Sequence, residues 1–164
     1  MDPLDLFAAE ALRFETWATS PGSTDEQAAT REALIRLTSL YLAGLQLPPA
    51  WSDGLLNQPD AESISVRECD RVIAHRSIPF DHHYSVFNPT IVPPDAEPSI
   101  HSVCDDFRDI YSDVITGLRA YQCGQRAQAN WEWGTGFTLH WGDHATSAIH
   151  SLHAWLRSNE NRIS

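Results

Sequence analysis

The sequence predicts an all-α protein, a single helical bundle of about five helices with an ordered proline-rich arm. Apolar residues recur every three or four positions along several long segments, which is the pattern of one buried helix face. Residues that favour helix starts and helix ends stand on both sides of those segments. The 164 residues are 42% hydrophobic, enough for one full core, so we expect one domain over residues 1–164.

The first two helices are bracketed by start and stop signals. Asp2 is expected to be the N-cap of the first helix, which ends at the turn residues 20–22. Thr24 and Gln27 form a capping-box pattern at the start of the second helix, and Pro48 stops it. The two helices are therefore expected to form an antiparallel hairpin.

A proline-rich arm is expected after a surface loop at 50–63 and a short third helix, which opens on the capping box of Ser65 and Glu68. The arm spans residues 77–98, whose five prolines exclude a helix or a central strand. The same stretch holds apolar residues that a disordered linker would lack, namely Phe80, Tyr84, Val86 and Phe87. We therefore expect an ordered arm that lies across the bundle with its rings in a groove.

Two longer helices complete the bundle. Ser99 is expected to cap the fourth helix, and Gly124 to end it. The fifth helix is expected to run without a break from about Gln125 to Arg157. It contains three glycines that each cost roughly 0.5–1 kcal/mol relative to alanine, at Gly134, Gly136 and Gly142. A close helix contact or a kink near the first two would explain why the helix tolerates them.

The charge of the chain excludes several chemistries. The formal net charge is −11, and all 11 basic residues are arginines. Without lysine there is no Schiff-base chemistry and no phosphate-binding loop lysine. The acidic field repels a phosphate backbone, so we expect no nucleic-acid partner and instead favour a basic protein partner.

The remaining composition favours a reduced, cytoplasmic protein. The N-terminus lacks the basic and apolar regions of a signal peptide, and no apolar stretch is long enough to span a membrane. The three cysteines are widely spaced and show no C-x-x-C pattern, so neither a disulfide framework nor a zinc knuckle is expected. No catalytic or cofactor-binding motif is recognisable, and no oligomeric state is predicted.

Acidic residues and histidines converge in the second half of the chain. On a helical wheel Asp106 and Asp113 border the apolar stripe and could turn inward, whereas Asp109 is expected in solvent. His140 and His144 fall inside an aromatic stripe, where each must be hydrogen-bonded or paired, most simply with an aspartate of the antiparallel helix before it. The candidate polar cluster comprises Asp106, Asp109, Tyr111, Asp113, Trp131, Glu132, Trp133, His140, Trp141 and His144.

Three hypotheses account for this cluster. The first is a structural His–Asp network that fixes helix register. The second is a ligand pocket under the arm, lined by Trp131, Trp133, Tyr84 and Phe87. The third is a divalent metal site, in which His140 and His144 bind the ion and Asp113, Asp106 or Glu132 completes the shell. His82 and His83 could add ligands, although adjacent histidines in a loop are usually exposed.

Several sequence elements also resemble a known family when taken in order and spacing. They are Leu40-Tyr41-Leu42, Leu47-Pro48, Tyr84, Val86-Phe87, Asp105-Asp106-Phe107, Asp109-Ile110-Tyr111, Asp113, Trp131-Glu132, Phe137, Trp141-Gly142 and Leu152-His153. In these the chain resembles a bacterial family catalogued as domain of unknown function 5063. The resemblance implies a small, mostly helical, stand-alone protein and no assigned activity. The family's pattern does not require the histidines at 140 and 144, which weighs against the metal hypothesis.

The functional prediction is therefore a small non-enzymatic binding or adaptor domain with an acidic surface and a buried His/Asp/Trp cluster. The alternative is a small metal-dependent or His/Asp acid–base enzyme. The first needs no cofactor, whereas the second would use a divalent metal ion at His140, His144 and Asp113.

Overall fold

The computed structural model describes residues 2–50, 63–74, 76, 78–86, 90 and 97–159. Most of the expected loop at 50–63 lies outside these ranges, and so do several residues of the arm, including Phe87. The elements, in chain order, are α1 (Pro3–Thr19), α2 (Glu26–Gly44), α3 (Val66–Ile73), β1 (His82–Ser85), β2 (Ser99–Ser102), α4 (Val103–Gln122), α5 (Arg126–Leu139) and α6 (Trp141–Asn159). None of the helices among the described residues is both long and apolar enough to cross a bilayer.

The first four helices begin where a capping side chain accepts hydrogen bonds from their first backbone N–H groups. The Asp2 carboxylate accepts a bond from the N–H of Leu4, and the Ser65 hydroxyl accepts one from the N–H of Glu68, both as predicted. The cap of α2 was predicted wrongly. Asp25, not Thr24, is the N-cap, because its carboxylate accepts hydrogen bonds from two backbone N–H groups. Its negative charge also interacts favourably with the positive end of the helix dipole.

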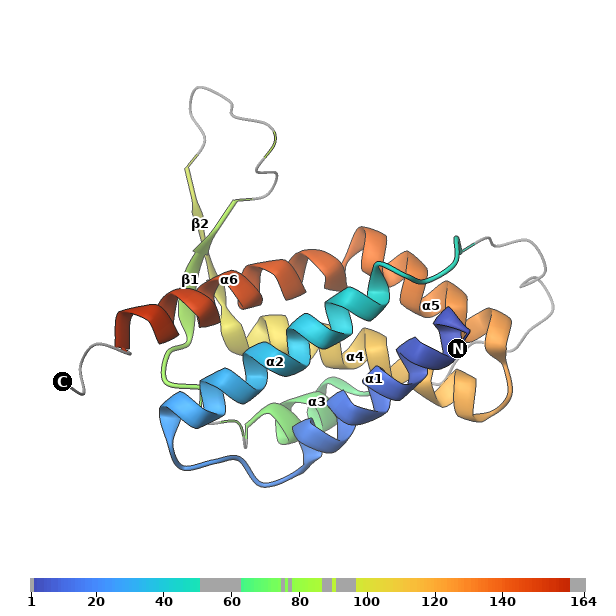
Figure 1. Cartoon of the computed structure of the whole chain (residues 1–164), viewed down its shortest axis with the longest axis horizontal. Coiled ribbons are helices and arrows are strands. Elements are labelled where there is room, and N and C mark those ends of the chain that lie inside the picture. Colours follow the sequence, from blue (N-terminus) through green and yellow to red (C-terminus); the bar gives the residue numbers. More distant parts are fainter. Residues whose placement is uncertain are drawn as a thin grey trace.

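The bundle is built around α4, which packs against α1, α3, α5 and α6, while α2 packs against α1 and α6 (Figure 1). The core is rich in aromatic rings at its centre. Phe7 of α1 lies 4.7 Å from the Trp133 ring and 5.8 Å from the Trp141 ring, measured between centroids, and all three side chains are fully buried. Burial of such large rings contributes most of the stabilising surface of a small core.

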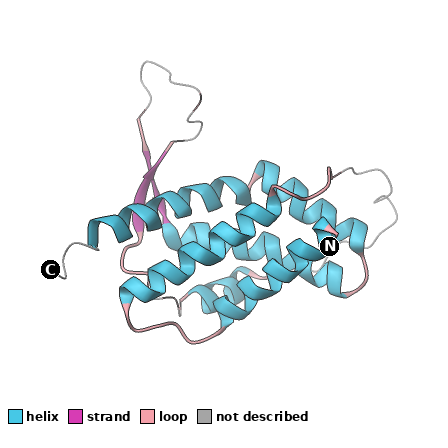
Figure 2. Ribbon diagram, viewed as in Figure 1, coloured by secondary structure: helices cyan, strands magenta, loops and turns pink. Residues whose placement is uncertain are grey.

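One strand of the arm pairs with the residues that follow the arm, in a two-stranded antiparallel sheet that the all-α prediction did not include (Figure 2). Residues 82–85 of β1 pair with residues 99–102 of β2, and the hairpin projects from the bundle beside α6 (Figure 1). Ser99 is therefore in β2, and it is Ser102 that caps α4, accepting a bond from the N–H of Asp105. The rings of the arm are not all buried: Phe80 stacks on Trp155, whereas Tyr84 is 72% exposed.

The predicted long last helix is broken at His140, so the described residues form six helices rather than five. His140 has φ −149° and ψ −85°, far from helical values, and a new helix begins at Trp141. Gly142 permits this break, because a Cβ there would lie 2.2 Å from the carbonyl oxygen of Phe137. The side chain of Trp141 closes the joint by donating its Nε1–H to the carbonyl of Trp133 at 3.1 Å.

Candidate functional site

A buried carboxylate lies at the centre of the site. Asp106, in the first turn of α4, is 1% exposed. One of its oxygens lies 2.7 Å from Nε2 of His83, and the other lies 2.8 Å from Nδ1 of His144. The single carboxylate therefore joins the hairpin to α6, and both of its oxygens have a histidine partner, as a buried charge requires.

His144 lies between two carboxylates. Its Nδ1 faces Asp106, and its Nε2 is 3.4 Å from an oxygen of Asp109 on the next turn of α4. The hydrogen bond to Asp106 is the main reason why the pKa of His144 is raised, and the charges of Asp106, Asp109 and Asp113 add to the effect while burial opposes it. Asp109, predicted to lie in solvent, is thus part of the site.

His140, like His144, has an aspartate next to its Nδ1, but it lies at the surface. Its Nδ1 lies 2.8 Å from an oxygen of Asp113, and its ring is edge-on to the His144 ring at 5.0 Å. The prediction that His140 is buried in an aromatic stripe was wrong, since its side chain is 48% exposed. The helical wheel assumed a continuous helix, and the break at His140 turns this residue out of the stripe.

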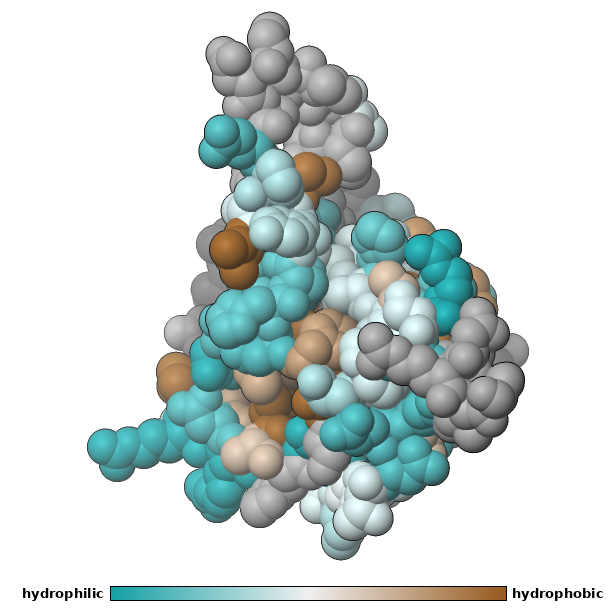
Figure 3. Space-filling view, turned by 90° about the vertical axis from the view of Figure 1, so that its left-hand side faces the viewer, coloured by the Kyte–Doolittle hydropathy of each residue, from teal (hydrophilic) through white to brown (hydrophobic). Residues whose placement is uncertain are grey.

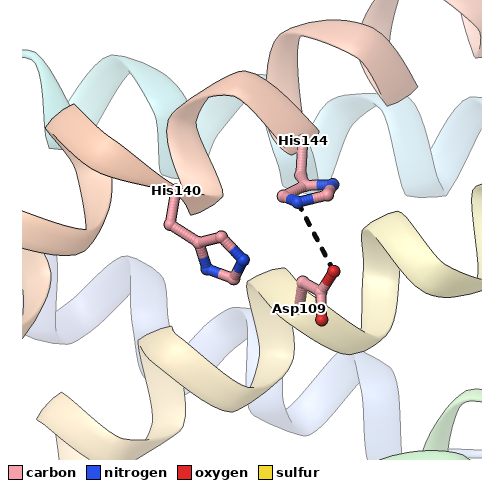
Figure 4. A group of neighbouring side chains, drawn as sticks. All are labelled: Asp109, His140 and His144. Carbon is pink, nitrogen blue, oxygen red and sulfur yellow. Dashed lines mark ion pairs between the residues drawn. The ribbon is translucent and has the colours of Figure 1, made fainter.

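Three side chains converge so that they could hold a metal ion. Asp109, His140 and His144 each offer one ligand atom, and these atoms all lie within 4.8 Å of one another. Figure 4 shows both imidazole rings turned toward Asp109, with α4 below and the joint between α5 and α6 above. Because Asp113 and Asp106 occupy the two Nδ1 atoms, the opposite ring nitrogens are left for the ion, the orientation that outer carboxylates impose in metal sites.

A pocket of about 590 Å³ opens beside this triad, between the hairpin and the first half of α6. Its lining includes exposed apolar side chains of the hairpin and of the end of α5, and Figure 3 shows hydrophobic residues among hydrophilic ones on the hairpin side of the molecule. A second hollow of about 320 Å³ lies next to the triad and is lined by Asp109 and His144. Both hollows are lined by His101, Asp106 and His144.

The aromatic members of the predicted cluster lie elsewhere. Trp133, Trp141 and Tyr111 are buried in the core, and burial raises the pKa of Tyr111 to about 12. Trp131 and Glu132 are half-buried on α5, and the Glu132 carboxylate accepts a bond from Gln128. Of the four residues predicted to line a ligand pocket under the arm, only Tyr84 is among the described residues that line the observed pocket. The prediction was wrong for Trp131, on α5, and for Trp133, in the core, and Phe87 lies outside the described residues.

His83 is the site residue that sequence reasoning missed. It was expected to be exposed like its neighbour His82, but its side chain is 6% exposed and reaches Asp106. The signal was available in strand alternation, because neighbouring residues of a strand point to opposite faces. The exposed side chains of His82 and Tyr84 on either side of His83 fit that alternation.

The raised pKa of His144 gives a testable pH dependence of stability. The pKa of His144 in the folded protein lies above its value in the unfolded chain, which is about 6.5. Protonated His144 therefore stabilises the fold fully below about pH 6.5, and this stabilisation is lost as the pH rises through the pKa of the folded state. We expect the urea midpoint of the chelator-treated protein to fall from pH 6 upward, and His144→Asn to flatten the profile. His153→Asn, an exposed histidine of α6, should leave the slope unchanged; an equal slope in both variants contradicts the assignment.

Together the fold and the site define a small helical-bundle protein with a His/Asp cluster beside a pocket that a β-hairpin borders. The chain belongs to the family described as domain of unknown function (DUF5063), whose model matches residues 2–158. The family resemblance found in the sequence is thereby confirmed.

A similar solved structure shows the same fold. The chain is similar to the crystal structure of protein BF1032 from Bacteroides fragilis, with a TM-score of 0.69 and 17% sequence identity over 92% of each chain. No match was found among curated proteins. At this identity the similarity supports the architecture alone, so the functional argument rests on the side chains of this protein.

Proposed function

We propose that this protein binds a divalent first-row transition metal ion through Asp109, His140 and His144, and that it is a metal-dependent enzyme acting on a small molecule in the adjacent pocket. The observation that supports this most directly is the pair of imidazoles held at Nδ1 by separate aspartates while facing a third. A network that served only to fix helix register would need neither the exposed His140 nor its alignment with His144.

The local charge favours a cation. Asp106, Asp109 and Asp113 face the two imidazoles, and the nearest arginine on α4, Arg108, is already paired with two other carboxylates, those of Asp70 and Asp105. A divalent ion would offset the excess negative charge between α4 and α6.

The donor set and its accessibility indicate the kind of ion. Two imidazole nitrogens with one carboxylate suit zinc, iron or a neighbouring metal better than calcium or magnesium, which prefer oxygen ligands. Three protein ligands leave coordination positions open, as in catalytic sites, whereas structural zinc sites are closed by four. The two hollows that His144 lines give a ligand access to such positions.

Zinc addition to chelator-treated protein should therefore stabilise the fold. At a zinc concentration 100 times the Kd, the expected gain is about 2.7 kcal/mol, or roughly 5–10 °C in Tm for a chain of this size. Calorimetry should give one site, and His144→Ala or Asp109→Ala should abolish it. His153→Ala is the matched control, because this exposed histidine of α6 lies outside the triad.

Asp113→Ala separates a positioning role from a structural one. Its side chain is 26% exposed and its partner His140 is more exposed still, so the free energy of unfolding should change by less than about 1 kcal/mol. Loss of the aspartate that orients the ring should nevertheless weaken zinc binding by roughly 10–100-fold. Zinc affinity unchanged in this variant, or absent in the wild type, contradicts the proposal.

The adaptor hypothesis rests on a different observation, the net charge of −11. A basic protein partner would bind through exposed carboxylates and would be insensitive to chelator. Wild-type protein whose Tm does not respond to zinc, and which retains a basic partner in chelator, would favour the adaptor over the enzyme.

A further inference from the structure

We infer that the ligand of this pocket is a small, neutral or singly charged acid derivative that binds the metal through its polar end and rests an apolar group against the hairpin. This inference rests on the proposed metal site and names the class of molecule that would bind there. It follows from the charge, the apolar lining and the size of the pocket.

The charge of the pocket excludes a strongly anionic ligand. The described residues that line the larger pocket include no arginine, and the chain has no lysine. Two carboxylates line it instead: Asp106, which lies within hydrogen-bond distance of His83 and His144, and Asp143, which is exposed at the start of α6. A phosphate ester needs several cationic donors and would be repelled here, whereas a single acid group can be balanced by the metal.

Apolar side chains form the outer part of the pocket, beyond the triad. Tyr84 of β1 is 72% exposed, and Val86, directly after β1, is 49% exposed. Leu139, the last residue of α5, is 74% exposed. Leu139 and Tyr84 are the two most exposed large hydrophobic residues among the described ones, and with Val86 they line the same pocket. Such placement matches an apolar group of a ligand whose polar end reaches the ion.

The pocket also offers a hydroxyl pair between the hairpin and α6. Ser85 and Ser147 lie 2.9 Å apart through their hydroxyl oxygens and are partly buried. Each hydroxyl can both donate and accept, so the pair can turn toward a carbonyl or hydroxyl of the ligand. The pocket volume of about 590 Å³ is in the range of sites for small organic molecules.

Two hydroxamates that differ only in their apolar group test the inference on zinc-loaded protein. Acetohydroxamate and benzohydroxamate bind metal through the same two oxygens. We expect the phenyl compound to bind roughly 10-fold tighter or more, because its ring removes apolar surface of Tyr84 and Leu139 from water. Tyr84→Ser and Leu139→Ser should each reduce that ratio toward one, with the affinity for zinc and for acetohydroxamate unchanged. Leu42→Ser, at an exposed leucine outside both hollows, is the matched control.

The outcomes separate the two proposals. Zinc binding without any preference for benzohydroxamate, or inorganic phosphate binding as tightly as benzohydroxamate, overturns the ligand class and leaves the metal site standing. Absence of zinc binding overturns both. A preference that Tyr84→Ser and Leu139→Ser leave intact places the phenyl ring elsewhere and also overturns the inference.

Discussion

Asp106→Ala is expected to destabilise the protein by about 3–5 kcal/mol, the cost of removing one partner from a buried charge network. The carboxylate is 1% exposed and bonds both His83 and His144. Its loss leaves two imidazoles without their carboxylate partner, one of them buried, and removes one of the contacts between the hairpin and α4. Urea unfolding of the chelator-treated variant at pH 6 measures the effect.

Two comparisons give this prediction its control. Asp105→Ala changes the neighbouring first-turn carboxylate, which is exposed and whose ion-pair partner among the described residues is Arg108, so its cost should stay within about 1 kcal/mol. The double variant Asp106→Ala/His144→Ala should show a coupling energy of roughly 0.5–3 kcal/mol, since the two side chains are in contact. Equal costs for Asp105→Ala and Asp106→Ala would mean that the buried network is not a stabilising feature.

The helical wheel predicted the position of Asp106 because it needed only local information. Asp106 borders the apolar stripe of a continuous helix, so its inward position followed from the 3.6-residue period, and the structure buries it. Asp109 is one turn further on and was expected in solvent. It remains partly exposed, and it belongs to the site because His144 of α6 approaches it. The helical period of α4 alone cannot predict a contact with another helix.

The break at His140 could not be located from the sequence for a similar reason. Three glycines indicated that the predicted helix is weak near residues 134–142. Where the helix breaks depends on which side chains and backbone atoms lie next to each glycine. A Cβ at Gly142 would strike the Phe137 carbonyl oxygen, whereas one at Gly136 would strike the Trp141 ring, 2.9 Å away. The break moves His140 to the surface and leaves His144 partly buried, so the pair that looked equivalent on one wheel has two environments.

In the hairpin, too, a pairing between distant parts of the chain decided the orientation of a site residue. The prolines of residues 77–98 excluded a helix, and the described residues of this stretch form none. The strand pairing joins residues 82–85 to 99–102 across the intervening loop, beyond the end predicted for the arm. Only that pairing fixes the alternation that turns His83 toward Asp106 and leaves Tyr84 at the pocket.

Trp133→Ala should destabilise the protein by about 3–5 kcal/mol, the usual cost of deleting a large buried ring. The side chain is fully buried, its Nε1–H donates to the carbonyl of Val114 at 2.8 Å, and its ring lies 4.7 Å from that of Phe7. Gly117 admits this ring, because a Cβ there would lie 2.3 Å from Nε1. Trp133 thus lies at the centre of the core and does not line the ligand pocket.

The neighbouring tryptophan of α5 provides the control, because Trp131 is only half-buried. Trp131→Ala should cost less than half as much, since less apolar surface is lost and the surrounding side chains can close the gap. Gly117→Ala should also destabilise, by about 1–3 kcal/mol, because the added methyl forces the Trp133 ring out of its position. A Trp133→Ala variant as stable as Trp131→Ala would show that the ring does not organise the contact between α1, α4 and α5.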